Sequence, residues 1–397
     1  MNTVLWARRR RCSGLAAVLL AMAGTMTVEA AGPHGVPPTR VARLAEGINV
    51  PGWLIYGAPG VPPLNERLSD ADLDVIQAVG FKHLRIPIDW SRIHDPTRID
   101  LLNLQCVARL DEAADRLIRR GLAMIVDLHH IRVEGEESNY SGPLQSDPAF
   151  VDTFVAFWGH LARHLSRHDP EFVFIEPINE PTFVGMSDRW PPIQKRLVAE
   201  IRRNAPRHTI LVTAAHWSHV DTFVRLEPLD DPNLIYNFHF YEPFPFTHQG
   251  ATWTVDWVEP LRGVPYPSSP EGVKSAIAAV DNPTARPHLK QYGRERWDAD
   301  KIEAEIAKAA RWARTHGRVV TCNEFGVHRP YAPPGDVVQW HRDVCSALSR
   351  HGFGWTKWEL DSSFGFFSRE NGKLVADPEL TRAMGLNVEA VPVKEVE

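Results

Sequence analysis

Residues 172–181 read Phe-Val-Phe-Ile-Glu-Pro-Ile-Asn-Glu-Pro, and this order of residues recurs along the chain. A short apolar and β-branched run, Phe172 to Pro177, gives way at once to polar residues and a turn. A run of this length between turn residues predicts a buried β-strand. The stretch therefore indicates a strand whose carboxyl end carries polar side chains.

Similar runs recur along the chain, and helical patterns lie between them. The eight expected strands are Ile48 to Ile55, His83 to Ile88, Ala123 to Leu128, Phe172 to Pro177, Thr209 to Ala214, Ile235 to Phe240, Arg318 to Asn323 and Gly354 to Glu359. The expected helices are Ala71 to Val79, Leu104 to Arg120, Pro148 to Arg167, Pro192 to Asn204, Asp300 to His316 and Asp336 to His351. This alternation predicts the α/β class and a single-domain (β/α)8 TIM barrel. An open doubly wound sheet is the alternative fold, but no Gly-x-Gly-x-x-Gly follows any expected strand.

The first thirty residues differ in composition from the rest of the chain. Four arginines, Arg8 to Arg11, precede an apolar run from Leu15 to Met22 and the sequence Val28-Glu29-Ala30. This order is typical of a secretory signal peptide, with cleavage expected after Ala30. The apolar run is too short to span a bilayer. We therefore expect a signal peptide over 1–30, the barrel domain over 31–388, a short tail over 389–397, and a secreted or periplasmic protein.

The segment 242–298 is unusually long for a connection and is rich in Pro, Trp and Tyr. Loops of this length in a compact domain are usually functional or mobile. We expect it to form one wall of a cleft after the sixth strand, and a surface insertion is the alternative. Its aromatic residues Trp253, Trp257, Tyr266 and Tyr292 are equally open to a core role and a substrate role.

Composition excludes some partners and leaves others open. A net charge of −5 gives no electrostatic case for nucleic acid or an anionic membrane. Outside the expected signal peptide, Cys106, Cys322 and Cys345 are scattered without metal-ligand spacing, so at most one disulfide is expected. We interpret Cys322 as a buried small hydrophobic residue.

Polar residues gather where each expected strand meets its following loop. In a TIM barrel these ends lie on one face, where active sites are found. The ends read Arg85-Ile86-Pro87-Ile88-Asp89-Trp90, Asp127-Leu128-His129-His130, Pro177-Ile178-Asn179-Glu180-Pro181, Asn237-Phe238-His239-Phe240-Tyr241, Cys322-Asn323-Glu324-Phe325-Gly326 and Trp355-Thr356-Lys357-Trp358-Glu359.

Glu180 and Glu324 end the fourth and seventh strands and would face one another across the barrel mouth. Hydrolysis of a glycosidic bond uses such a pair: one carboxyl group protonates the leaving oxygen while the other attacks or stabilises the oxocarbenium carbon, and a separation of about 5 Å marks the retaining route. The acid needs a raised pKa, whereas the nucleophile must stay ionised among hydrogen-bond donors. We expect Arg85 and Tyr241 to be the donors beside Glu324.

Asn179-Glu180-Pro181 and Asn323-Glu324-Phe325-Gly326 together resemble the clan A glycoside hydrolases, in particular family 5, the cellulase family. The resemblance implies Glu180 as general acid/base and Glu324 as nucleophile. It further implies that Asn179 binds the sugar 2-hydroxyl group, that Arg85 and Tyr241 orient the nucleophile, that His129 and His239 line the site, and that Trp358 lies under the sugar at the cleavage point. Further candidates for sugar contacts, at or near strand ends, are His130, Trp53, Trp90 and Trp217.

We therefore expect a monomeric, exported endo-β-glycanase that cleaves β-1,4-glucan, cellulose-like or mixed-linkage, through a covalent intermediate at Glu324 and without a cofactor. β-Mannanase, β-1,3-glucanase and β-glucosidase activities are alternatives on the same residues. A metal-dependent hydrolase using His129, His239 and a carboxylate such as Asp127 is a hypothesis from another class. A non-catalytic carbohydrate-binding protein that keeps an aromatic cleft is a third.

Overall fold

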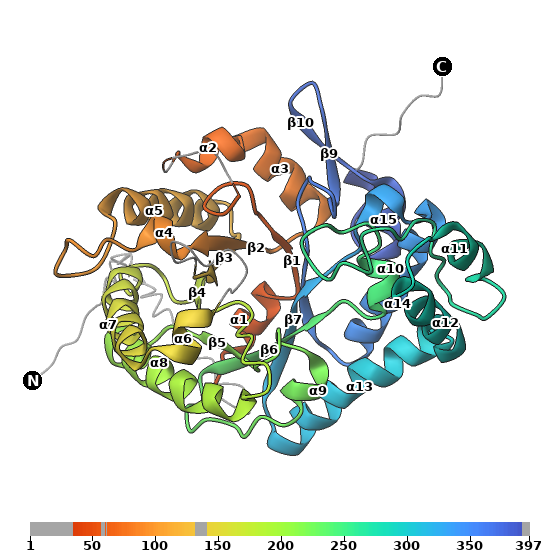
Figure 1. Ribbon diagram of the computed structural model, residues 1–397. Helices are drawn as coiled ribbons and strands as arrows, with labels where there is room; N and C mark the ends of the chain where they lie inside the picture. Colours follow the sequence, from red (N-terminus) through yellow and green to blue (C-terminus); the bar gives the residue numbers. More distant parts are fainter. Residues whose placement is uncertain (1–34, 57–59, 61, 132–140, 391–397) are drawn as a thin grey trace, which may run out of the picture. The chain divides into compact units, whose positions relative to one another are not determined.

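Eight parallel strands close into one barrel in the computed structural model, which describes residues 35–56, 60, 62–131 and 141–390. The strands are β1 (Glu46–Asn49), β2 (His83–Asp89), β3 (Ala123–His130), β4 (Val173–Glu176), β5 (Ile210–Thr213), β6 (Leu234–Phe240), β7 (Val319–Phe325) and β8 (Gly354–Lys357). Each strand pairs with the next in chain order, and β8 pairs with β1 (Figure 1). The TIM barrel predicted from the sequence is confirmed.

Long helices surround the barrel, as Figure 1 shows. They are α3 (Asp70–Val79), α5 (Leu104–Arg119), α7 (Pro148–Leu165), α8 (Trp190–Asn204), α13 (Ala299–His316) and α14 (Pro334–Arg350). Shorter elements are α1 (Pro38–Arg43), α2 (Leu64–Arg67), α4 (Trp90–Ile93), α6 (Gly142–Ser146), α9 (Val220–Phe223), α15 (Pro378–Ala383), the 3-10 turns η1 (Ser187–Arg189), η2 (Arg329–Tyr331) and η3 (Val388–Ala390), and the hairpin β9 (Phe367–Glu370) and β10 (Lys373–Ala376). The six expected helices are all present, with ends shifted by a few residues.

Two sequence predictions of local structure were wrong. The first strand ends at Asn49 and does not continue to Ile55, because Pro51 lacks a backbone donor and Gly52 has a φ of 80°, which the extended ladder does not accept. The segment 242–298 is not an irregular loop: it contains the helices α10 (Phe244–Thr247), α11 (Lys274–Ala279) and α12 (Ala285–Glu295).

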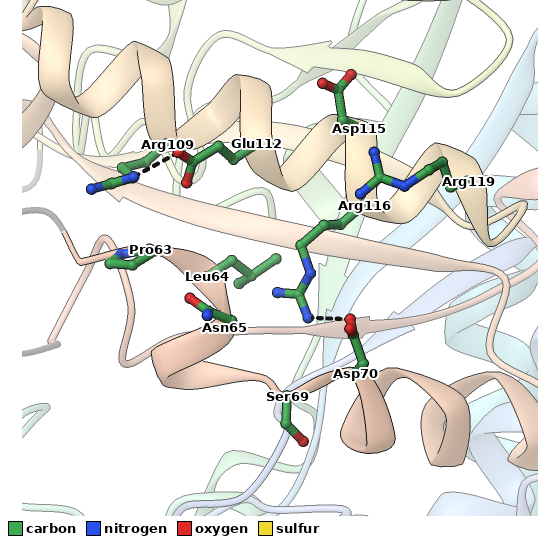
Figure 2. Close-up of a pocket in the computed structure, with 10 residues that line it drawn as sticks. All are labelled: Pro63, Leu64, Asn65, Ser69, Asp70, Arg109, Glu112, Asp115, Arg116 and Arg119. Carbon is green, nitrogen blue, oxygen red and sulfur yellow. Dashed lines mark hydrogen bonds and ion pairs between the residues drawn. The ribbon is translucent and has the colours of Figure 1, made fainter.

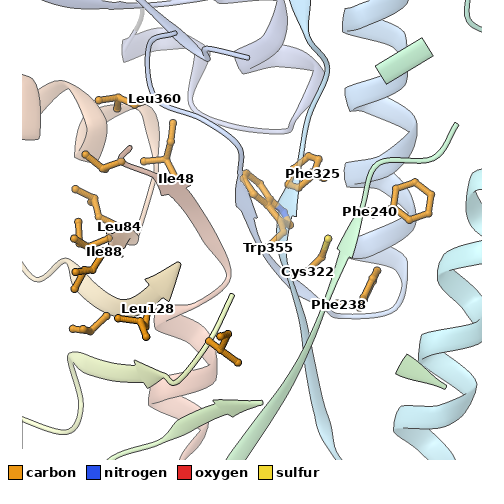
Figure 3. Close-up of a cluster of buried hydrophobic side chains, with 14 of the residues drawn as sticks. Ile48, Leu84, Ile88, Leu128, Phe238, Phe240, Cys322, Phe325, Trp355 and Leu360 are labelled. Carbon is orange, nitrogen blue, oxygen red and sulfur yellow. The ribbon is translucent and has the colours of Figure 1, made fainter. Parts of the chain in front are cut away.

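The outward side chains of the strands form the main hydrophobic core together with the surrounding helices. Figure 3 shows part of this core, with Ile48, Leu84, Ile88, Leu128, Phe238, Phe240, Cys322 and Trp355 among the labelled residues. Cys322 is fully buried, and Cys106, Cys322 and Cys345 are all free thiols. Burial of the apolar side chains between the strands and the helices is the main stabilising contribution to such a fold.

A second, smaller core fills the lower half of the barrel interior. Its buried members are Val36, Leu44, Ala123, Ile125, Phe174, Leu211 and Ile235. Val36 and Leu44 flank α1, so the chain before the first strand closes the barrel at its amino-terminal end. Gly354 makes this closure possible, because a Cβ atom there would lie 2.1 Å from the carbonyl oxygen of Leu44.

The expected signal peptide and residues 391–397 of the expected tail lie outside the described residues. Within the described ranges, no helix is both long enough and apolar enough to cross a bilayer.

Candidate active site

The carboxyl ends of the strands bring the expected site residues to one mouth of the barrel. Glu324 lies in β7, and Glu180 follows β4 after a short turn. In that turn the backbone amide of Asn179 donates to the carbonyl of Leu128 in β3 at 3.0 Å. One carboxylate oxygen each from Glu180 and Glu324 and one ring nitrogen of His239 all lie within 4.8 Å of one another. His239 Nδ1 is hydrogen-bonded to Glu180 Oε1 at 2.7 Å and lies 3.7 Å from Glu324 Oε2.

A register shift directs Glu324 into the mouth of the barrel. In the β6–β7 pair, Phe238 is opposite Cys322 but His239 is opposite Glu324, so Asn323 is an extra residue. A bulge of this kind breaks the alternation of side chains between the two faces of a sheet. Asn323 donates to Glu176 at 3.1 Å and Glu324 accepts from Arg85 at 2.7 Å, so both neighbours contact the interior network.

Arg85 lies at the centre of a buried network of carboxylates. It is fully buried and contacts Glu324 at 2.7 Å, Glu176 at 2.8 Å and Asp127 at 3.0 Å. It also donates to Asn179 Oδ1 at 2.7 Å and to Asn49 Oδ1 at 2.9 Å. A charge buried this deeply is tolerated when it is paired and its donors are satisfied.

The sequence patterns assign no functional role to Asn49, Glu176 and Lys357. The one signal for Glu176 is a lone charge inside the apolar run Phe172 to Pro177, four residues before Glu180.

Glu324 and Glu180 have different surroundings. Glu324 is 5% exposed and accepts from Arg85 at 2.7 Å and from the Tyr241 hydroxyl at 3.0 Å, whereas Glu180 is 20% exposed and has His239 as its neighbour. Burial raises the pKa of Glu180 to about 8. Burial also raises the pKa of Glu324 to about 7, and the positive charge of the Arg85 guanidinium group opposes this rise. The carboxyl group in contact with the guanidinium group is therefore the more easily ionised of the two.

His129 is held by polar partners on both ring nitrogens. Its Nδ1 lies 2.7 Å from Asp127 Oδ2, and its Nε2 lies 3.3 Å from Asn179 Nδ2. Its ring stacks on Trp358, with centroids 5.2 Å apart and an interplanar angle of 14°. The set of His129, His239 and Asp127 expected for a metal is not among the ligand-like groups found within the described residues. The ligand-like cluster found within the described residues is Glu180, His239 and Glu324.

The chain after β8 is anchored to the barrel by a buried cation. Lys357 is fully buried, and its Nζ donates to the carbonyl groups of Trp358 and of Phe364, the latter at 2.7 Å. Gly326 leaves room for this arrangement, since a Cβ atom there would lie 2.3 Å from the Trp358 carbonyl oxygen. The two hydrogen bonds of Lys357 hold the partly buried Trp358 at the mouth of the barrel.

The other residues expected to contact sugar differ in exposure and in their contacts. Trp53 is 1% exposed and donates its Nε1 to the Pro62 carbonyl, so its proposed role in substrate binding is wrong: the ring is core. Trp90 is 6% exposed and stacks on His94 at 4.1 Å. His130 is 3% exposed, with Nε2 3.2 Å from the Tyr56 hydroxyl. Trp217 is 42% exposed and donates its backbone amide to Pro181 at 3.4 Å, next to Glu180.

A separate hollow lies elsewhere on the molecule. It has a volume of about 700 Å³ and lies against α2, α3 and α5, and Figure 2 shows that charged side chains dominate its lining. Arg116 pairs there with Asp70, and Arg109 with Glu112. None of its lining residues is aromatic or belongs to a strand end, so it does not match the site described above.

A parallel eight-stranded barrel with two close carboxyl groups at its carboxyl-terminal mouth is the arrangement found in many glycoside hydrolases. A family model described as cellulase, glycosyl hydrolase family 5, matches residues 58–363. The chain belongs to this family of glycoside hydrolases, and the resemblance carried by the two glutamate motifs is confirmed.

Individual relatives are more distant. Endoglucanase 3 of Fibrobacter succinogenes is 28% identical over 367 residues, which cover 86% of this chain and 53% of that protein, so the chain spans about half the length of this relative. Endoglucanase C of Acetivibrio thermocellus is 25% identical over 315 residues, covering 79% of this chain and 90% of that protein. The structure of Thermotoga maritima Cel5A in complex with cellobiose aligns with a TM-score of 0.67 and 22% identity over 87% of this chain and 98% of that one, a likeness of fold.

Proposed function

We propose that this protein is a retaining endo-β-glycanase that hydrolyses β-1,4-glucan, with Glu180 as general acid/base and Glu324 as nucleophile. The observation that carries the proposal is the closeness of the two carboxylates, because one oxygen of Glu180 and one oxygen of Glu324 lie within 4.8 Å of one another. Retaining enzymes hold their two carboxyl groups about 5–5.5 Å apart, whereas inverting enzymes leave room for a water molecule between them.

In the first step, a Glu324 oxygen attacks the anomeric carbon while Glu180 gives its proton to the leaving oxygen. The glycosyl–enzyme ester forms as the glycosidic C–O bond breaks. In the second step, Glu180 takes a proton from water, the water oxygen attacks the anomeric carbon, and Glu324 leaves as a carboxylate. Two inversions at that carbon retain the β configuration.

The neighbouring residues have proposed roles that follow from their contacts. Arg85 and Tyr241 each donate to a different oxygen of Glu324 and so stabilise its anion and fix its plane. Asn179 has its oxygen engaged by Arg85 and one N–H directed at His129, which leaves its second N–H for the sugar 2-hydroxyl group. His129 and His239 line the site, and Trp358 presents its ring beneath the sugar at the cleavage point.

The substrate and location are part of the same proposal. β-1,4-Glucan is favoured by the curated relatives named endoglucanase. β-Mannan, β-1,3-glucan and short β-glucosides are the competing substrates. Export guided by residues 1–30, with a mature domain over 31–388, would bring the enzyme to such polymers.

The test begins with reducing-sugar release from carboxymethylcellulose, mixed-linkage β-glucan, laminarin, mannan and xylan. We expect release from the two β-1,4-linked glucans that persists in EDTA and is lost in Glu324→Ala. Release from mannan or laminarin alone would overturn the substrate, and loss of activity with EDTA would overturn the mechanism.

A second measurement separates the two glutamates. Glu180→Ala should lose activity on polymers but still form the glycosyl–enzyme from an aryl cellobioside, whose leaving group needs no proton. Glu324→Ala should lose both reactions. Equal behaviour of the two variants would contradict the assignment of roles, and an α-anomer as first product would contradict retention.

A further inference from the structure

The connection between β5 and α9 contains three consecutive residues with positive φ, none of which is glycine. His216, Trp217 and Ser218 have φ values of 61°, 56° and 58°. These values lie in the left-handed region, which residues with a Cβ atom enter at a cost in energy. Residues persist there when their surroundings fix them, and such residues cluster at functional sites. The contacts of this left-handed turn, residues 216–218, therefore bear on its role.

The left-handed turn holds the segment that carries the proposed general acid/base. The amides of its first two residues donate to the carbonyl groups of Thr182, at 2.8 Å, and Pro181, at 3.4 Å. The hydroxyl group of its third residue, Ser218, donates to the carbonyl group of Asn179 at 3.0 Å. These three carbonyl groups lie on both sides of Glu180 in the chain, so the turn fixes the backbone before and after the proposed acid/base.

The barrel ladder does not reach this segment on its β5 side. β4 ends at Glu176, so Glu180 lies four residues beyond the strand. In the part of the chain that the structure describes, the ladder between β4 and β5 pairs Ile175 with Ile210 and extends no further. The left-handed turn therefore supplies, from the β5 side, the hydrogen bonds that a longer ladder would provide.

Ser218 also contacts the residue that faces Glu180. The Ser218 carbonyl group accepts from the amide of His239 at 3.0 Å, and His239 Nδ1 lies 2.7 Å from Glu180 Oε1. The Ser218 hydroxyl group accepts from Thr213 Oγ1 at 2.7 Å while it donates to Asn179. Ser218 is fully buried, so bulk water does not compete for these bonds. One residue therefore binds the chain on both sides of the Glu180–His239 hydrogen bond.

The residue type at position 218 fits this arrangement. Glycine adopts a positive φ without steric cost, whereas Ser218 carries a Cβ atom at a φ of 58°. A glycine would lack the hydroxyl group that donates to Asn179. The serine accepts the backbone strain and supplies this hydrogen bond.

We propose that Ser218 is a positioning residue for proton transfer by Glu180, which acts through the Asn179 carbonyl group and the His239 amide. This inference rests on the proposed function. A general acid must lie within hydrogen-bond reach of the leaving oxygen, and a displacement of about 1 Å can cost about 100-fold in rate. Loss of the Ser218 hydroxyl group should therefore weaken acid catalysis and leave the other steps intact.

The experiment compares kcat/KM for wild type, Ser218→Ala and Ser218→Gly on two substrates. One is a β-1,4-gluco-oligosaccharide, whose leaving oxygen needs a proton, and the other is an aryl cellobioside, whose leaving group needs none. We expect Ser218→Ala to lower kcat/KM by about 10-fold on the oligosaccharide and to stay within about twofold of wild type on the aryl cellobioside. Ser218→Gly should show the same selective loss, with a melting temperature no lower than that of Ser218→Ala, because glycine relieves the strained φ.

The matched control is Thr222→Val, which removes another hydroxyl group from the same connection. Thr222 Oγ1 donates to the carbonyl group of Ala215 at 2.7 Å. This variant should behave as wild type on both substrates, because the lost bond lies within the connection and does not join it to the Glu180 segment.

Two results would overturn the positioning role. One is an unchanged kcat/KM of Ser218→Ala on the oligosaccharide, and the other is an equal fall on both substrates, which would indicate a structural role. In both cases, cleavage of the oligosaccharide by wild type and its loss in Glu180→Ala would leave the proposed function intact. Failure of the wild type on the oligosaccharide would instead contradict the proposed function and the positioning role with it.

Discussion

The upper and lower halves of the barrel interior are built from the same strands but have opposite chemistry. In β3, Ile125 belongs to the lower apolar cluster and Asp127, two residues later, to the Arg85 network. In β4 the same step leads from Phe174 to Glu176. The one buried histidine of β2, His83, is on the lower side, and burial lowers its pKa to about 3, so it is neutral at physiological pH.

This difference teaches how one strand can serve stability and chemistry together. Side chains alternate between the two faces of a strand, so every second residue points into the barrel. The lower positions exclude water with apolar side chains, and the upper ones then work in a low-dielectric interior where each charge interacts strongly. If the two halves have distinct roles, substitutions in the lower half should change stability alone, and substitutions in the upper half should also change activity.

Replacement of Arg85 should damage both stability and activity. Arg85→Met leaves the carboxylates of Asp127, Glu176 and Glu324 without their buried cation. We expect the free energy of unfolding to fall by about 3–5 kcal/mol, and kcat/KM to fall by about 10²–10³-fold. Chemical denaturation and steady-state kinetics measure the two effects.

The control for this prediction is Arg40→Met, at the opposite end of the barrel. Arg40 pairs with Glu171 at 2.7 Å, but that carboxylate is 31% exposed and can be solvated when its partner is removed. If both variants lose the same free energy of unfolding, the buried Arg85 network contributes no more to stability than a partly exposed ion pair.

Phe174→Ala should separate stability from chemistry. The ring is fully buried in the lower cluster, so its removal leaves a cavity that we expect to lower the free energy of unfolding by about 3–5 kcal/mol. kcat/KM per folded molecule, measured well below the melting temperature, should stay within about twofold of wild type. A large fall in kcat/KM would mean that the lower half shapes the site directly.

The pH dependence of kcat/KM should report the two upper carboxyl groups. As the proposed nucleophile, Glu324 acts when ionised, so activity should fall about tenfold per pH unit below its pKa of about 7. As the proposed general acid, Glu180 acts when protonated, so activity should fall in the same way above its pKa of about 8. Initial rates on a β-1,4-gluco-oligosaccharide, whose leaving oxygen needs the Glu180 proton, across the pH range from about 4 to 10 test this. An acidic limb at the ordinary pKa of glutamate would contradict the conclusion that burial is the main influence on the pKa of Glu324.

Lys357→Met should give the smallest effect. Burial lowers the pKa of Lys357 to about 7, and its Nζ holds the carbonyl groups of Trp358 and Phe364. Carbonyl groups left without a donor cost about 1–3 kcal/mol, partly offset because a buried cation is removed. We expect a several-fold rise in KM with kcat little changed. If the rise also occurs in a Trp358→Ala background, Lys357 does not act through Trp358.

The sequence predicted the fold and the two carboxylates Glu180 and Glu324, because both follow from the order of neighbouring residues in the chain. Eight apolar runs with helical patterns between them specify the barrel, and the ends of its strands share one face. It could not predict that Trp53 is core and Trp253 exposed, since both are tryptophans in irregular segments. Nor could it place Asn323 beside Glu324 in the interior network, because strand alternation sends neighbours to opposite faces unless a bulge intervenes.

The sequence by itself determined the barrel, the family, and the pairing of one glutamate after the fourth strand with another at the end of the seventh. Only the tertiary structure decided the distance between the two carboxylates, the convergence of Glu176, Asp127 and Glu324 on Arg85, and the different surroundings of the two catalytic candidates. The physical reason is that electrostatic interactions depend on distance and burial between residues far apart in the chain, which local sequence patterns do not record.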